Sequence, residues 1–330
     1  MSGKKKANVP AGREFTRRTT REGWGAGLVE VGKAHEDAVV LVSDNIRSLN
    51  VDGFLEAFPE RTFQMGISEQ NMVNVAAGMS RFGKVPFYTT YSAFGVGRAF
   101  DQLRVTVGYT PCNVKIGGGH SGISVGPDGA THQMLEDIAL LRALPNFTVL
   151  VPADYEQTKK AVIAAYDIDG PVYIRFGREA VPDVTTEDDP FIPGRAQVMA
   201  EGNDLTCIAM GQMVSEALLA HDALAELGIG LRVLNMHTVK PLDEEAIVLA
   251  AEQTGAIVTA EEHQIYGGLG SAVAQVVARE YPVPMGYVAV MDRYGQSGRP
   301  EELLDAFGLR SGDIVDRAKR VLLAKRSARE

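Results

Sequence analysis

The sequence predicts an α/β protein with two three-layer units, each a parallel sheet covered by helices on both faces. From residue 21 onward, short β-branched or apolar runs alternate with longer segments of helical period, which is typical of parallel strands joined by helices. The chain has 330 residues, of which 45% are hydrophobic and 23% are charged. These values suit about two globular domains and exclude disordered and collagen-like classes.

The first half of the chain contains six expected strands and one strongly patterned helix. In the segment 68–82, Met72, Val75, Ala76 and Met79 fall on one helical face, and Ser68 stands at the N-cap position directly before Glu69. The expected strands are 38–43, 62–65, 85–89, 113–116, 147–151 and 172–175.

An acidic, proline-bearing stretch from Pro182 to Pro193 interrupts this alternation and indicates a linker. A second α/β pattern follows it. Its expected strands are 205–210, 231–235, 256–259 and 287–290, and its expected helices are 214–227, 242–253, 269–281 and 314–323. We therefore expect a basic flexible tail over 1–13, a first domain over 14–181, a linker over 182–195 and a second domain over 196–330.

Charge and hydropathy exclude several classes of partner. The net charge is -9, although residues 1–21 carry seven basic residues and one acid. An acidic body without an aromatic-interleaved basic stripe disfavours nucleic-acid binding. Apolar runs such as 38–42 are far shorter than the ~18 residues of a membrane span. No secretory signal is evident, and Cys112 and Cys207 form no disulfide framework or metal pair. We expect a cytoplasmic protein that binds neither nucleic acid nor membrane.

The loops that follow the strands of the first domain are the expected location of a functional site. In open α/β sheets, ligands bind beyond the carboxyl ends of the strands. Four such loops are polar and distinctive in sequence, at 43–48, 66–71, 91–95 and 117–133.

Glu69 has two interpretations at the start of its helix. The helix dipole favours a negative charge there, so the residue can be an ordinary solvated acid. Burial against apolar or aromatic groups would instead let the carboxyl hold and pass a proton near neutral pH. Tyr91 and Phe94 are candidates for that wall, because aromatic faces stack on planar heterocycles, although such pairs also occur in ordinary cores.

His120, Asp128 and His132 lie in a glycine-rich segment whose backbone can approach a ligand closely. Three interpretations compete for them. A metal site is disfavoured, because the spacings match no familiar zinc pattern. The imidazoles can satisfy loop carbonyls, or the three side chains can form a polar pocket for a hydroxylated substrate, which we favour.

Taken together, these loops resemble the C-terminal half of transketolase, a pyrimidine-binding domain followed by a transketolase C-terminal domain, over about residues 14–325. The first domain carries the resemblance in Gly-Ile-Ser-Glu-Gln at 66–70, Tyr-Ser-Ala-Phe at 91–94, the segment 120–133 and Pro-Ala-Asp at 152–154. The second carries it in Lys-Pro-Leu-Asp at 240–243, Glu-Glu-His at 261–263, Gly-Gly-Leu-Gly at 267–270 and Asp-Arg-Tyr-Gly at 292–295.

The resemblance implies thiamine diphosphate chemistry. Glu69 would hydrogen-bond the ring nitrogen of the aminopyrimidine and thereby favour deprotonation of the thiazolium carbon. Tyr91 and Phe94 would stack on the pyrimidine, and Asp44 would lie near the thiazolium. The family usually has leucine where this chain has Asn45, and only Gly97 stands where a third aromatic can occur.

The resemblance also implies a sugar-phosphate site. His120 and His132 would bind the hydroxyls and phosphate of the donor and take part in catalysis, and Asp128 would read a hydroxyl configuration. A guanidinium fork suits phosphate. The implied phosphate clamp is Arg178, with Arg17 and Ser48 aligned less surely.

One expected motif is missing from the sequence. Full-length transketolases carry a preceding domain in which a Gly-Asp-Gly segment and a downstream Asn hold magnesium and diphosphate, and no Gly-Asp-Gly occurs here. We therefore expect the C-terminal subunit of a split transketolase. A separately encoded N-terminal subunit would hold Mg²⁺ (or Ca²⁺), and the two subunits would form a dimer of heterodimers that transfers a two-carbon ketol unit between sugar phosphates.

Three other functions remain open at this stage. They are the β subunit of a 2-oxo-acid dehydrogenase decarboxylase, a deoxyxylulose-phosphate-synthase-like half and a non-catalytic transketolase-like regulator. His120 and the segment 128–133 favour a ketose donor over the first, and His120 alone argues against the second, which shares the Asp-Gly-x-Thr-His segment.

Overall fold

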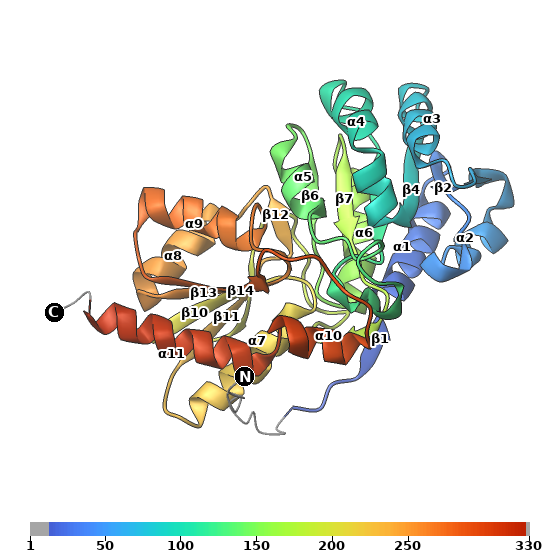
Figure 1. Cartoon of the computed structure of the whole chain (residues 1–330). Coiled ribbons are helices and arrows are strands. Elements are labelled where there is room, and N and C mark those ends of the chain that lie inside the picture. The colour runs from blue at the N-terminus through green and yellow to red at the C-terminus, as the bar shows by residue number, and fades with distance from the viewer. Residues whose placement is uncertain (1–12, 328–330) are drawn as a thin grey trace.

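The computed structural model describes residues 13–327 of the chain. They form two α/β units, one around a seven-stranded sheet and the other around a five-stranded sheet (Figure 1). The expected basic tail lies outside the described residues except for Arg13, whose Nε is 2.7 Å from a carboxylate oxygen of Asp222 in the second unit. No helix within residues 13–327 has the length and apolar character needed to cross a membrane.

The first unit is built on a sheet in which all strands are parallel except one edge strand. The strand order is β12-β6-β7-β5-β4-β2-β3, and β12 runs antiparallel to β6. The bounds are β2 Ala38–Val42, β3 Thr62–Gln64, β4 Val85–Tyr91, β5 Lys115–Gly119, β6 Thr148–Leu150, β7 Val172–Arg175 and β12 Thr238–Lys240.

Helices cover both faces of this sheet. Buried residues of α1 (Thr20–Ala34), α2 (Asp52–Ala57) and α6 (Tyr155–Asp167) pack in one cluster, which includes Trp24. Buried residues of α3 (Glu69–Arg81) and α5 (Asp137–Ala143) pack in another, together with the π-helical segments η3 (Ala93–Arg98) and η4 (Leu103–Tyr109), which flank the short α4 (Phe100–Gln102). Short 3-10 turns η1 (Arg47–Leu49) and η2 (Pro59–Arg61) lie on either side of α2.

The second unit has strand order β14-β13-β10-β11-β9, parallel except for the edge strand β9. Buried residues of α7 and α11 pack in one cluster, and those of α8 and α9 pack in another. The strands are β9 Gln197–Ala200, β10 Leu205–Ala209, β11 Leu231–Asn235, β13 Ile257–Gln264 and β14 Met285–Val290. The helices are α7 Met213–Ala225, α8 Glu244–Thr254, α9 Leu269–Glu280, α10 Pro300–Phe307 and α11 Ser311–Ser327.

The predicted α/β class is confirmed. The prediction of parallel sheets is corrected, because each sheet has one antiparallel edge strand. Strand β12 follows β11 in the chain but joins the sheet of the first unit, where Thr238 pairs with Leu150. Local periodicity could not reveal β9 and β12, because they are four and three residues long and depend on partners far away in sequence. The expected strand at 113–116 is displaced to Lys115–Gly119, and the one at 256–259 extends to Gln264.

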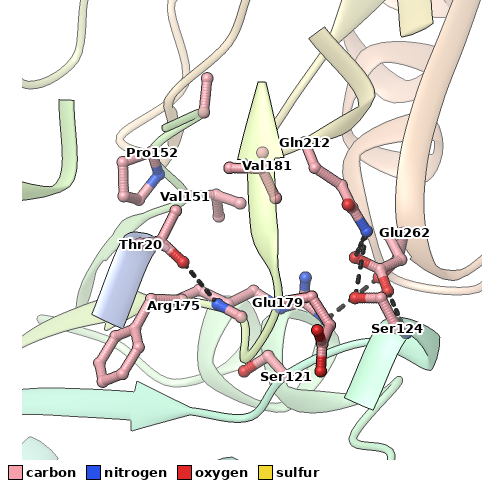
Figure 2. Close-up of a pocket in the computed structure, with 14 residues that line it drawn as sticks. Thr20, Ser121, Ser124, Val151, Pro152, Arg175, Glu179, Val181, Gln212 and Glu262 are labelled. Atoms are coloured by element: carbon pink, nitrogen blue, oxygen red, sulfur yellow. Dashed lines mark hydrogen bonds between the residues drawn. The ribbon is translucent and has the colours of Figure 1, made fainter. Parts of the chain in front are cut away.

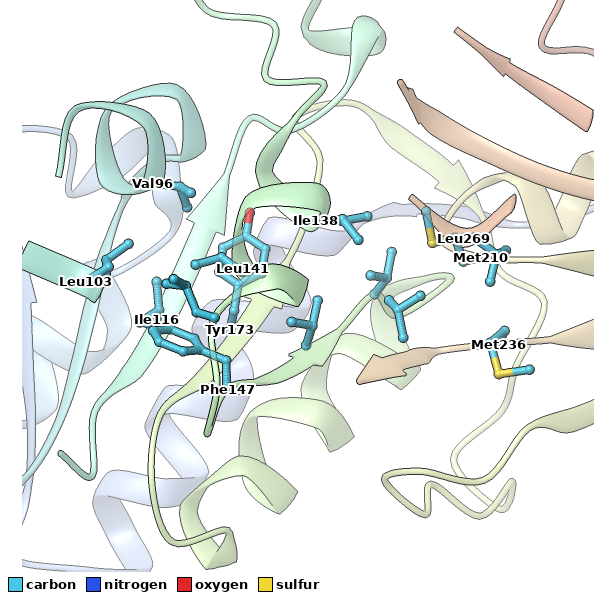
Figure 3. Close-up of a cluster of buried hydrophobic side chains, with 14 of the residues drawn as sticks. Val96, Leu103, Ile116, Ile138, Leu141, Phe147, Tyr173, Met210, Met236 and Leu269 are labelled. Carbon is cyan, nitrogen blue, oxygen red and sulfur yellow. The ribbon is translucent and has the colours of Figure 1, made fainter. Parts of the chain in front are cut away.

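A continuous apolar core joins the two units. Ile138, Leu141 and Tyr173 of the first unit belong to the same buried cluster as Met210, Met236 and Leu269, which come from the second (Figure 3). The junction between the units is therefore a buried interior.

The stretch expected to be a linker is held firmly against the first unit. Asp154 is fully buried and caps α6 by accepting a hydrogen bond from the Gln157 N–H at 2.9 Å. Its carboxylate also accepts hydrogen bonds from the Val184 N–H at 2.7 Å, the Thr185 N–H at 2.6 Å and the Thr185 hydroxyl at 2.7 Å. Nearby, β1 (Arg17–Thr19) and β8 (Ala180–Pro182) form a separate antiparallel pair.

We predict that Asp154→Asn lowers the free energy of unfolding by about 3 kcal/mol, because an amide NH₂ would face backbone N–H groups that need an acceptor. Urea denaturation measures this change. Asp222→Asn is the control. It removes a partly exposed pair with Arg13, so we expect a loss of less than about 1 kcal/mol. Equal losses in the two variants would contradict the anchoring role of Asp154.

Candidate functional site

The polar loops meet at one edge of the first sheet. Strands β2, β3, β4 and β5 are mutually parallel, so their carboxyl ends lie side by side. The Ser43 hydroxyl after β2 hydrogen-bonds the Thr90 hydroxyl at the end of β4 at 3.0 Å, and it also contacts the side-chain oxygen of Asn45. Asp44 lies on this same loop and is exposed.

An aromatic cluster forms where β4 and β5 end. The rings of Tyr91 and His120 stack with their centroids 3.9 Å apart. The ring centroids of Tyr91 and Phe94 are 6.3 Å apart. The His132 ring forms T-shaped contacts with both aromatic rings. Its centroid is 6.2 Å from that of Tyr91 and 5.2 Å from that of Phe94. Phe94 belongs to the π-helical segment η3, a type of turn that is often found at functional sites. Residues that are up to 41 positions apart in sequence thus belong to one aromatic cluster.

Glu69 begins α3, as predicted, and its side chain is only 3% exposed. Its Oε2 is 2.8 Å from Nη1 of Arg98, and the Arg98 guanidinium lies 4.7 Å from the centre of the Phe94 ring. The guanidinium therefore neutralises a carboxylate that would be costly to bury alone, and it links Glu69 to the aromatic cluster. Ser68 does not cap the helix through its side chain as expected, because its hydroxyl donates to the Met65 carbonyl at 2.7 Å.

His120 is a buried imidazole in a cationic environment. It is 2% exposed, its backbone has a left-handed φ of 53°, and its Nδ1 has no hydrogen-bond partner. Burial, reinforced by the charges of Arg21, Arg178 and His132, lowers the pKa of His120 to about 3. The ring is therefore neutral at physiological pH.

Two arginines flank His120, and one of them was not identified from the sequence. Arg178 donates to the Val125 carbonyl at 3.2 Å and lies 3.4 Å from Asp128. Arg21 donates to the carbonyl of Ser48 at 3.1 Å, and its Nε is buried without a partner. The Ser48 hydroxyl in turn accepts a hydrogen bond from the Tyr91 hydroxyl at 3.2 Å. The structure thus brings Arg21, Ser48, Asp128 and Arg178 close to the aromatic cluster.

Arg17, which the resemblance implied as a phosphate ligand, lies elsewhere. Its guanidinium donates to the Ala180 carbonyl at 2.7 Å, within the β1–β8 pair. No local sequence signal selects Arg21, because the capping box formed by Thr19 and Glu22 only places it in the first turn of α1.

Metal ligation has no support in the part of the chain that the structure describes. Within residues 13–327, no group of three or more histidine, cysteine, aspartate or glutamate side chains is arranged to hold a metal ion. His132 Nδ1 lies 2.9 Å from the Thr131 hydroxyl, and Asp128 pairs with Arg178. The histidine and acidic side chains of the cluster are thus engaged by hydrogen-bonding and cationic neighbours.

We predict that His120→Asn weakens the dependence of stability on pH. Between the folded pKa of about 3 and the ordinary value of 6.5, the unfolded chain binds more protons at this residue than the folded chain. His120 therefore destabilises the folded state as pH falls through this range, by about 1.4 kcal/mol per pH unit. Asparagine tolerates the left-handed backbone and carries no titrating ring. Urea unfolding at pH 4, 5 and 6 measures the slope, and an unchanged slope in the variant would contradict the neutral state of His120.

Comparison with known proteins gives a consistent family. Residues 16–184 match the transketolase pyrimidine binding domain, and residues 194–314 match the transketolase C-terminal domain. The chain is 41% identical to the 6-deoxy-6-sulfo-D-fructose transketolase subunit of Clostridium sp. (strain MSTE9), covering 89% of this chain and 91% of the relative. It is 40% identical to an apulose-4-phosphate transketolase subunit of Phocaeicola vulgatus, covering 86% of this chain and 90% of the relative.

Longer relatives and a solved structure agree with this result. The chain spans about half the length of transketolase-like protein 1 of Bos taurus, with 39% identity and 51% of that relative covered. A solved structure described as a split gene transketolase, inactive beta4 tetramer, superimposes with a TM-score of 0.88 at 47% identity, covering 93% of this chain and 99% of that chain. The two matched domains and these relatives establish that the chain belongs to the transketolase family and corresponds to its C-terminal section.

Proposed function

We propose that this chain is the C-terminal subunit of a two-chain transketolase, which transfers a two-carbon ketol unit from a ketose phosphate to an aldose phosphate. One observation carries the proposal. The buried carboxylate of Glu69 lies beside an aromatic pocket that also contains two histidines and is flanked by Arg21 and Arg178. The relatives named as transketolase subunits support the same interpretation.

The residues present fit the pyrimidine half of thiamine diphosphate, the cofactor implied by the pyrimidine-binding domain. Tyr91 and Phe94 offer ring faces for a planar heterocycle, and Glu69 offers a buried carboxyl that can share a proton with a ring nitrogen. Asp44 is the residue assigned to the thiazolium side. When bound, thiamine diphosphate supplies the carbon nucleophile that adds to the ketose carbonyl. Glu69 must exchange part of its contact with Arg98 for the ring nitrogen, so Arg98 positions the carboxylate before the cofactor arrives.

The remaining pocket residues are assigned to the sugar phosphate. A neutral imidazole can donate one hydrogen bond and accept another, so His120 suits a hydroxyl whose proton moves during the reaction. His132 and Asp128 are assigned to further hydroxyls of the donor. Arg178 and Arg21, with Ser48 between Arg21 and Tyr91, are assigned to the anionic group.

The diphosphate and its metal are assigned to a partner. The sequence has no Gly-Asp-Gly segment, and residues 13–327 contain no metal-binding group of the kind described above. We therefore propose that a separately encoded N-terminal subunit holds Mg²⁺ (or Ca²⁺) and the diphosphate, and that two heterodimers assemble into a heterotetramer.

Co-expression of the chain with an N-terminal transketolase subunit from the same source tests the proposal. The complex, supplied with thiamine diphosphate and Mg²⁺, should convert xylulose 5-phosphate and ribose 5-phosphate, and the chain alone should not. Turnover by the isolated chain would contradict the shared site. A complex active only on pyruvate or branched 2-oxo acids would instead identify the β subunit of a decarboxylase.

We predict that Glu69→Gln lowers kcat of the complex at least 100-fold, because an amide cannot exchange a proton with the ring nitrogen. Proton exchange at the thiazolium carbon, followed by NMR, should slow by a similar factor. Glu60→Gln, at a side chain that is 72% exposed, is the matched control and should leave both rates unchanged. If proton exchange at the thiazolium carbon proceeds at the wild-type rate in the Glu69→Gln complex, Glu69 does not have the proposed role.

A further inference from the structure

The segment 120–133, called the site loop below, rests on the C-terminal domain. Ile123 is fully buried in the same hydrophobic cluster as Leu205 and Val258 of that domain. The side-chain amide of Gln133 donates to the carbonyls of Ile123 and Gly126 within the loop, at 3.0 and 3.3 Å. The same amide also donates to the carbonyl of Gln296 in the C-terminal domain at 2.9 Å. The loop that carries His120, Asp128 and His132 is therefore held partly by residues of the other domain.

Glu262 makes the polar contact at the centre of this interface. It belongs to β13 and is 7% exposed. Its Oε1 accepts a hydrogen bond from the backbone N–H of Ser124 at 2.7 Å, and its Oε2 accepts one from the side chain of Gln212 (Figure 2). Gln212 also donates to the Ser124 hydroxyl at 3.2 Å. Because Oε1 accepts from the Ser124 N–H, Glu262 fixes the site loop midway between His120 and Asp128.

The backbone of the site loop needs such support. His120 and Gly122 both have left-handed φ values, 53° and 89°. A Cβ placed on Gly122 would lie 2.4 Å from the carboxyl carbon of Glu262. The glutamate side chain therefore packs against the backbone of Gly122, where only glycine leaves enough space. Conformations of this kind persist where the surrounding structure determines them.

The cavity beside Glu262 is small. It is lined by Ser121, Ser124, Arg175 and Gln212 among others, and its volume is about 30 Å³. The contacts of Glu262 described above are all made to the chain itself.

From these observations we propose that the C-terminal domain sets the shape of the site loop, with Glu262 as the positioning residue for binding the donor sugar phosphate. The inference rests on the proposed function. It gives the C-terminal domain a specific part in substrate binding, although that domain contributes none of the assigned pocket side chains.

The test is Glu262→Gln in the assembled two-chain complex. With the Gln212 amide oriented as in the structure, the new amide has one acceptor oxygen for two donors, so one hydrogen bond is lost. The KM for the ketose phosphate should rise about tenfold, the equivalent of about one hydrogen bond, with a much smaller change in kcat. Hydrogen–deuterium exchange of residues 121–128 should accelerate, while the affinity for thiamine diphosphate stays unchanged.

The double variant Glu262→Gln with Gln212→Glu provides the rescue. It exchanges the two side chains, so the amide oxygen at position 262 can accept from Ser124 while its NH₂ donates to the carboxylate at position 212. Both KM and exchange of the loop should return toward wild type. A purely steric or structural defect would persist in this variant.

Asp243→Asn is the matched control. Asp243 is also 7% exposed, and it accepts hydrogen bonds from the Ala246 N–H at 3.1 Å and the Ala196 N–H at 2.8 Å, away from the site loop. It should lower stability without raising KM. Unchanged hydrogen–deuterium exchange of the site loop in Glu262→Gln, or an equal rise of KM in Asp243→Asn, would overturn the positioning role of Glu262.

The failure of the proposed function is distinguishable from this result. A wild-type complex that transfers no ketol unit would overturn the proposed function, whereas exchange of the site loop is measured without the activity assay.

Discussion

A buried ion pair between Arg175 and Asp137 holds the junction on which the rest of the structure depends. Arg175 ends β7, Asp137 starts α5, and the Nε–Oδ2 distance is 2.8 Å with both side chains almost fully buried. Arg175 also donates to the carbonyl of Met134, just beyond the site loop, at 3.2 Å, and to the carbonyl of Glu262 in the C-terminal domain at 3.1 Å. One guanidinium thus connects the first sheet, the site loop and the second domain.

The electrostatics of this pair explain why it is retained in an apolar interior. Burial alone would raise the pKa of Asp137, but Arg175, with help from His263 and the Tyr173 hydroxyl, keeps that pKa below its ordinary value. The Tyr173 hydroxyl donates to the same carboxylate oxygen at 2.6 Å. Removing one member of such a pair leaves an uncompensated buried charge, which costs more than the pair itself contributes. Loss of either member alone would therefore destabilise the junction.

Features set by local sequence were predictable, and features set by distant partners were not. The apolar period of residues 68–82 predicted the helix that starts at Glu69, and the polar loops after the strands predicted the pocket that contains Tyr91, Phe94, His120 and His132. The Arg98 contact with Glu69 could not be inferred from the sequence, because it depends on the π-helical turn after β4. Arg21 was missed for a similar reason, since only the folded position of α1 brings it beside His120.

Strand β12 has a consequence for any attempt to divide this chain. It leaves the second sheet, forms the edge of the first, and returns to α8 in the second unit. A fragment ending near residue 195 would keep the whole aromatic pocket but lose the strand that covers β6. The exposed edge of β6 would then present unpaired backbone groups, which is a common cause of aggregation. Each domain has its own sheet, but a strand from the C-terminal half of the chain completes the sheet of the first domain. The isolated pyrimidine-binding domain is therefore a poor candidate for an independent folding unit.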